Sequence, residues 1–202
     1  MSLKVTAVNL ALIRIGVSNT IAGLDEQSRE AFTASAIIDH EFRAVLRQFP
    51  WAFATKYLDL TLVSGTVTVP VNADWQYSYT YPADCLLARR IVDGARRGHE
   101  TDPIQFRVGR EDNALIVYTD EVDACLEYTA VFDCPEHLGD ELFVDAFAWR
   151  LAAAMAPSLS RIKGMAETAY QMFLLSIDTA SAVSSREQQQ APQGEAEWIA
   201  GR

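Results

Sequence analysis

The spacing of apolar residues divides this chain into helical ends and a strand-like middle. Between residues 24 and 51, apolar side chains recur in steps of three, four and seven residues, at Ala31, Ile38, Phe42, Val45 and Phe49. Such steps place side chains on one face of an α-helix. Asp25 is expected to cap this helix and Pro50 to end it. We therefore predict one helix, on the order of 35 Å long, that forms the structural axis of the fold.

Three shorter stretches have the same helical period. The first covers residues 3–15, and its short connection to the long helix predicts that these two helices pack together as antiparallel neighbours. The second begins at Asp140 and is expected to end at Pro157. The last helix follows, with Ser158 or Ser160 as its cap.

The middle of the chain has the alternating pattern of β-strands. Leu58, Leu60 and Leu62 alternate with polar residues and predict one strand, followed by a turn at residues 64–65 and a second strand at residues 66–71. Further strands are predicted at residues 86–92, 104–108, 115–118 and 125–131. Between them lie an acidic turn (Asp120, Glu121, Asp123) and a basic turn (Arg89, Arg90, Arg96, Arg97).

The clearest strand has an aromatic face. Its aromatic residues alternate with the polar Gln76, Ser78 and Thr80, and they are Trp75, Tyr77, Tyr79 and Tyr81. Such a stripe could stack on a sugar or a base. In an acidic chain we favour the alternative, in which the stripe is a sheet face that packs on helices.

These patterns predict an α+β fold. Residues 1–54 and 134–186 are expected to form one antiparallel helical bundle, and residues 55–133 a mainly antiparallel β insertion carried on it. Residues 187–202 are polar, contain Pro and Gly, and are expected to be flexible in isolation. Because this tail includes Trp198 and Ile199, we expect it to order on a partner.

Composition narrows the possible functions. The chain has 202 residues, half of them hydrophobic, which fits one domain or one core with an insertion. Its formal net charge is −10, so it gains no counterion-release term from DNA, and tight general DNA binding is not expected. No apolar run approaches the roughly 20 residues of a membrane span, and the first residues are expected to form a structural helix rather than an export signal.

No pattern of chemically reactive residues points to catalysis. The three cysteines have no paired metal spacing and are expected to be small buried residues of a protein made in a reducing compartment. His40, His99 and His137 lie far apart in the sequence, and no phosphate loop or GxSxG motif is present. The carboxylate pairs at residues 25–26 and 140–141 fall at helix starts, where the helix dipole accounts for them. We expect no cofactor and no metal, and interpret the chain as a scaffold.

Several stretches together resemble a known family. They are LALIRIG at residues 10–16, IAGLDEQSREA at 21–31, FPWAFA at 49–54, DWQYSYTYPADCL at 74–86, LIVYTDE at 115–121 and EWIAGR at 197–202. Their order and spacing resemble the head-to-tail connector adaptors of tailed bacteriophages, the group of tail tubular protein A and the tail accessory factor of short-tailed phages. Ala52 stands where that family commonly has Asn.

The resemblance implies a structural virion protein. Such adaptors form a ring, usually of twelve copies, that is assembled in the host cytoplasm, binds the portal protein at the head–tail junction, extends the DNA channel and receives the tail or nozzle protein. Genome DNA would pass an acidic lumen without specific binding. The candidate partner-binding residues of this chain are Trp198 and Ile199 in the tail and Arg89 and Arg90 in the basic turn.

Two alternatives remain open at this point. A phage-associated peptidoglycan hydrolase would use carboxylates such as Glu26, Asp140 and Glu141. A carbohydrate or small-ligand module would instead expose the aromatic stripe of residues 75–81. No membrane partner is expected.

Overall fold

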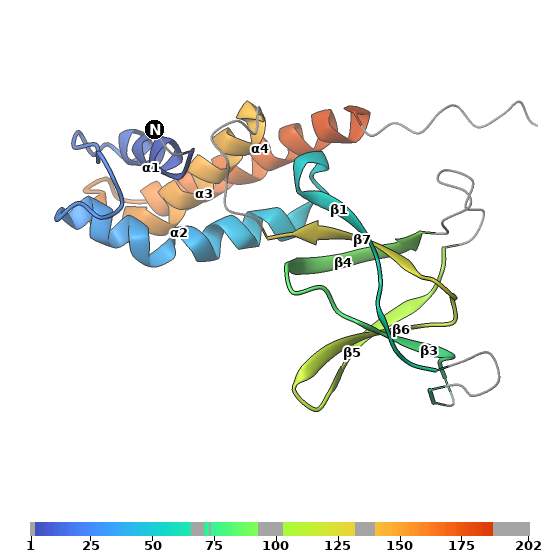
Figure 1. Ribbon diagram of the computed structural model, residues 1–202. Helices are drawn as coiled ribbons and strands as arrows, with labels where there is room; N and C mark the ends of the chain where they lie inside the picture. The colour runs from blue at the N-terminus through green and yellow to red at the C-terminus, as the bar shows by residue number, and fades with distance from the viewer. Residues whose placement is uncertain (1–2, 66–70, 73, 93–102, 132–139, 188–202) are drawn as a thin grey trace, which may run out of the picture. The chain divides into compact units, whose positions relative to one another are not determined.

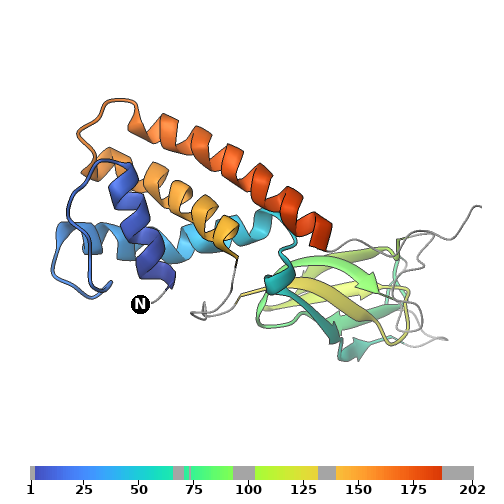
Figure 2. The same ribbon diagram turned by 90° about the horizontal axis from the view of Figure 1, so that it is seen from above.

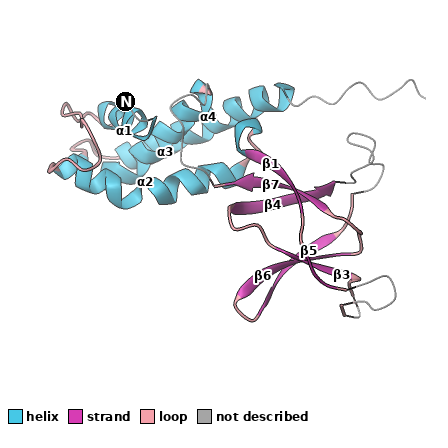
Figure 3. Ribbon diagram, in the orientation of Figure 1, coloured by secondary structure: helices cyan, strands magenta, loops and turns pink. Residues whose placement is uncertain are grey.

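The computed structural model describes residues 3–65, 71–72, 74–92, 103–131 and 140–187. These residues form four α-helices, one 3₁₀ turn and seven strands in two antiparallel sheets, which confirms the α+β class (Figures 1 and 3). The chain divides into a helical unit, residues 1–54 and 131–184, and a β unit, residues 55–130 and 185–202.

The long helix α2 is shorter than predicted. It spans Arg29–Gln48, and Ser28 rather than Asp25 is its cap, with the Ser28 hydroxyl accepting the Ala31 N–H at 3.2 Å. The residues before Ser28 form a separate turn, in which the Glu26 carboxylate accepts the Ala22 N–H at 2.9 Å. Ser28 itself has the extended backbone that a capping residue adopts, so the helix can begin only after it.

The third helix continues past the proline that was expected to end it. Helix α3 spans Glu141–Leu159, with Asp140 as its cap and Pro157 inside its last turn. A proline removes only its own N–H bond, and the preceding turn is held by the buried Met155 and Ala156. Ser160 follows the end of α3 and donates its hydroxyl to the Ile15 carbonyl at 2.9 Å. It lies five residues before α4, which spans Met165–Glu187, and so does not cap that helix.

Helix α3 is the centre of the helical unit. Its side chains are apolar around most of its circumference, so both α1 (Leu3–Arg14) and α2 pack against it. The predicted pairing of α1 with α2 is minor by comparison. The ring of Phe143 contacts the rings of Phe42, Trp51 and Phe53 at centroid distances of 5.9, 5.1 and 4.9 Å. Phe53 lies in the 3₁₀ turn Ala52–Ala54, so this aromatic cluster fixes the end of the segment that follows α2.

Helix α4 runs alongside α3 (Figure 2) and packs on it through one stripe. Its buried side chains follow helical spacing: Ala169, Phe173, Ile177 and Ala180. The Arg150 guanidinium of α3 lies over the rings of Tyr170 and Phe173, 5.6 and 5.5 Å from their centroids. The four helices therefore share one unit, while their arrangement as a regular antiparallel bundle stays a prediction.

The β unit contains two sheets. The first has the order β1 (Thr55–Asp59), β7 (Cys125–Ala130), β4 (Cys85–Val92). The second has the order β2 (Leu62–Ser64), β3 (Tyr77–Thr80), β6 (Ala114–Thr119), β5 (Phe106–Glu111). The predicted strands at 86–92, 115–118 and 125–131 correspond to β4, β6 and β7, whereas β5 is displaced toward its C-terminal side.

The single strand predicted through Leu58, Leu60 and Leu62 is wrong, because the chain changes sheets there. The Leu60 N–H bonds the Ala124 carbonyl at 2.9 Å, next to the first sheet. The following carbonyl, of Thr61, accepts the Thr80 N–H of the second sheet at 2.9 Å. Successive residues of an extended chain direct their backbone groups to opposite sides, so one bent segment serves both sheets. Of the strand predicted at 66–71, residues 66–70 lie outside the described residues, and β2 pairs with β3.

The central tyrosines of the aromatic stripe lie in the core of the β unit. Tyr77 is 6% and Tyr79 is 2% exposed, and both pack with Val117, Leu126 and Ile91 of the two sheets. Their burial was predicted, but their partners are strand residues rather than helices. These two rings therefore offer no open platform to a sugar.

Candidate partner-binding surfaces

Of the four predicted partner-binding residues, the structure describes two. Trp198 and Ile199 lie outside the described residues. Arg89 and Arg90 lie within β4, so the predicted basic turn does not include them, and Arg96 and Arg97 lie outside the described residues. Two adjacent arginines do not make a turn here, because strand pairing continues to Val92.

A bulge brings both arginines to the same face of the first sheet. The register of β4 against β7 shifts between Ala88 and Arg90. As a result, Arg89 donates through Nε to the Thr129 hydroxyl at 3.0 Å, and Arg90 donates through Nε to the Glu127 carboxylate at 2.7 Å. Residues 127 and 129 are two apart on one strand and share a face, so the bulge is what lets neighbouring arginines reach both.

Glu127 is the middle residue of a row of three paired residues, one on each strand of the first sheet. It lies opposite Tyr57 on β1 and Arg90 on β4. Glu127 is 9% exposed, so its charge needs the guanidinium beside it. Partial burial and the adjacent Glu127 carboxylate raise the pKa of Tyr57. The cation of Arg90 thus has a partner within the sheet, and its role in binding another chain stays a prediction.

We expect Arg90→Ala to lower the free energy of unfolding by about 1–3 kcal/mol, because it leaves the buried Glu127 carboxylate without its cation. The double variant Arg90→Ala/Glu127→Gln should regain most of this loss. Urea unfolding followed by circular dichroism gives the comparison. An Arg90→Ala protein as stable as the wild type would show that Arg90 is not needed by the sheet.

A second polar cluster joins the three strands of the same sheet. Asp84, just before β4, accepts a bond from Lys56 of β1 at 2.7 Å and from the hydroxyl of Tyr128 of β7 at 2.9 Å. The bond from Lys56 holds the pKa of Asp84 below its ordinary value. Burial, together with the bond to Asp84, raises the pKa of Tyr128 to about 12. At neutral pH the Asp84 carboxylate is therefore ionised and the Tyr128 hydroxyl is protonated, as the hydrogen bond between them requires.

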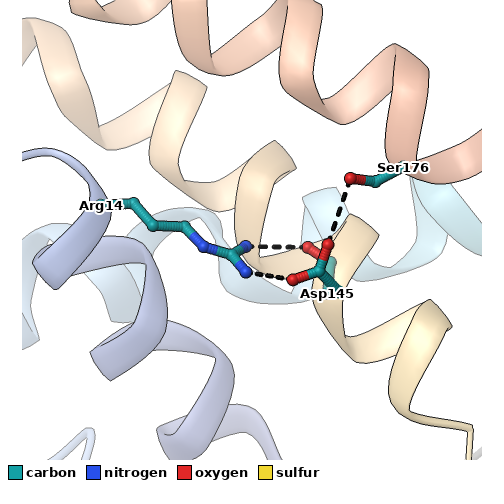
Figure 4. Close-up of polar contacts among 3 residues, drawn as sticks. All are labelled: Arg14, Asp145 and Ser176. Carbon is teal, nitrogen blue, oxygen red and sulfur yellow. Dashed lines mark hydrogen bonds and ion pairs between the residues drawn. The ribbon is translucent and has the colours of Figure 1, made fainter.

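Polar contacts also tie the helices together, among them two that no local pattern in the sequence indicates. Figure 4 shows the Arg14 guanidinium of α1 on Asp145 of α3, whose carboxylate also accepts the Ser176 hydroxyl of α4 at 3.1 Å. Arg150 of α3 donates to the Glu41 carboxylate of α2 at 2.5 Å. The paired residues are 131 and 109 positions apart in the sequence, too far for any local pattern to reveal them.

Both units leave large apolar side chains exposed. On α4, Met172, Leu175 and Val183 are 36, 62 and 37% exposed, and their spacing of three and eight residues places them on one side of the helix. We call these three residues the α4 surface. In the β unit, Tyr57, Leu58, Leu62 and Val63 are about half exposed along β1 and β2. These exposed apolar side chains are the candidate contact surfaces of the two units.

A pocket of about 340 Å³ lies at the turn between α3 and α4. We call it the turn pocket. Its apolar lining comes from the end of α3 and the start of α4, and consists of Ala156, Pro157, Met165 and Ala166. Arg161, Lys163 and Glu167 contribute the charged groups, and Ile162 between the two cations is 56% exposed.

The carboxylates named for hydrolysis do not converge. Arg29 of α2 donates to the Ser158 carbonyl of α3, while Phe42 packs on Phe143, so the two helices are antiparallel. Glu26, before α2, therefore lies at the opposite end of α3 from Asp140 and Glu141. A helix of 19 residues is about 28 Å long, well beyond the roughly 5–10 Å of a glycosidase pair. Asp140 is also used as a cap, accepting the Phe143 N–H at 2.9 Å.

Within the described ranges, no group of three or more His, Cys, Asp or Glu side chains is placed to hold a metal ion. His40 is exposed on α2, while His99 and His137 lie outside those ranges. One described helix, α3, has the length and composition of a membrane span, although Asp145 and Arg150 interrupt its apolar residues. Half of that stretch is buried within the protein, as its central place between α1 and α2 requires.

The chain was also compared with models of known protein families and with curated proteins. Neither comparison gave a match.

Proposed function

We propose that this chain is a structural subunit of the head-to-tail connector of a tailed bacteriophage. In this role it forms a ring with identical copies, binds the portal protein, extends the DNA channel and provides a platform for the tail or nozzle protein. The family resemblance of the ordered stretches along the chain supports this role.

The observation that carries the proposal is the apolar area exposed on both units. The α4 surface and the exposed residues of β1 and β2 belong to different parts of the chain. A ring subunit needs two different contact surfaces, because each copy meets its neighbours through unlike faces. Separate apolar surfaces on one small chain fit this requirement.

The charge of the chain fits passage of DNA. At a net charge of −10 the protein repels phosphates, and DNA in a channel lined by such subunits would slide without being held. The aromatic cluster around Phe143 and the salt bridge between Arg150 and Glu41 would keep each helical unit rigid during this passage.

A binding assay with the portal protein of the same phage tests the proposal. Full-length chain mixed with assembled portal should co-sediment in a density gradient as one large complex. The same preparation should not clear a peptidoglycan zymogram. Failure to bind the portal, or lysis of the cell-wall substrate, would contradict the proposed role.

A further inference from the structure

We propose that the turn pocket of one copy binds residues 195–199 of a neighbouring copy. This inference rests on the proposed function, because it assigns one of the contacts through which copies form the ring. It would make the C-terminal segment a strap between subunits.

The turn pocket combines apolar area with positive charge. Its lining of Ala156, Pro157, Met165 and Ala166 is accompanied by two exposed cations, Arg161 and Lys163, with Glu167 as the opposing charge. Two cations next to an apolar hollow are notable in a chain whose net charge is −10. A ligand that brings carboxylates together with large apolar groups would match both properties.

Residues 195–199 have this chemistry in a single short stretch. They read Glu-Ala-Glu-Trp-Ile, so two carboxylates directly precede two large apolar side chains. Glu195 and Glu197 would face Arg161 and Lys163, and the side chains of Trp198 and Ile199 would enter the apolar part. Trp is among the residue types that contribute most to protein contacts, because one side chain buries a large area.

The length of the chain favours the pocket of a neighbour over the copy's own pocket. Helix α4 starts at the pocket and has 23 residues, so it ends about 34 Å away. Trp198 lies eleven residues beyond Glu187. Fully extended they span about 37 Å, and as an ordinary flexible chain about 18 Å. A copy's own segment would reach back only when drawn nearly straight along α4, whereas a neighbour's pocket needs no such stretching.

The test uses a fluorescent peptide of residues 187–202 and full-length protein whose own segment is disabled by Trp198→Ala/Ile199→Ala. We expect fluorescence anisotropy to show saturable binding. Reversing either set of charges, Arg161→Glu/Lys163→Glu in the protein or Glu195→Lys/Glu197→Lys in the peptide, should weaken binding about tenfold. Combining the two reversals should restore it. A matched control, Arg107→Glu/Arg110→Glu on β5, reverses two exposed cations elsewhere and should leave binding unchanged.

Competition with the wild-type chain then distinguishes docking on a neighbouring copy from docking within one copy. If the C-terminal segments dock on neighbouring copies, they will block peptide binding to the wild-type protein more strongly as the protein concentration rises. If peptide binding is blocked to the same degree at every protein concentration, the segment docks within one copy, and the inference is overturned. Absence of peptide binding, or no restoration on combining the reversals, would overturn it as well. Portal binding is scored separately, so loss of the strap with portal binding intact would refute this inference alone, and the reverse result would refute only the proposed function.

Discussion

Replacing Phe143 with alanine should lower the free energy of unfolding by about 3–5 kcal/mol, the range found when a large aromatic residue is removed from a packed core. Phe143 is 1% exposed, and its ring contacts Phe42, Trp51 and Phe53. These residues come from α2, from the segment after it and from the 3₁₀ turn. The cavity would therefore loosen the junction where the chain leaves the helical unit.

Chemical denaturation followed by far-UV circular dichroism measures this loss. Phe32→Ala is the matched control, because Phe32 lies on α2 at 78% exposure, and its removal should change the stability by less than about 0.5 kcal/mol. Similar losses for both variants would mean that the aromatic cluster does not carry the stability of the helical unit.

The second large effect is expected on assembly rather than on folding. Leu175→Glu should weaken the association between copies by at least about tenfold, because burying a leucine contributes about 1.5–3 kcal/mol and a buried carboxylate without a partner opposes contact. Leu175 is 62% exposed in the single chain, so the melting temperature should remain that of the wild type. Sedimentation velocity over a range of concentrations gives the association constant.

Gln171→Glu provides the matched control for charge. Gln171 is exposed on α4 one turn before Leu175, so this variant adds the same charge without removing apolar area. It should associate much more strongly than Leu175→Glu. If Leu175→Glu assembles like the wild type, the α4 surface is not a contact between copies.

Much of the architecture could be predicted from the sequence because its signals are local. Helical spacing and Asp140 located the helices, and alternation located β4, β6 and β7. The predicted start of α2 and the predicted strand through Leu60 were wrong, because contacts with other parts of the chain determine the structure there. Ser28 replaces Asp25 as a cap because the residues before it are held in their own turn, and the bent segment at Leu60 exists only because two sheets compete for its backbone.

The candidate surfaces could be predicted far less well. Periodicity identifies apolar positions on α4 but cannot say that Phe173 is buried while Leu175 is exposed, since that depends on where α3 lies. The charge of Arg90 is visible in the sequence, but its partner Glu127 is 37 residues away on another strand. The turn pocket joins the ends of two helices and has no sequence signature of its own.

The most direct test of the central claim is electron microscopy of particles of the tailed bacteriophage proposed to encode this protein, with antibody against the full-length chain as the label. The account predicts label confined to the head–tail junction, and a ring of identical subunits below the portal into which the two units of this chain fit. Label elsewhere on the particle, or its absence from particles, would contradict it.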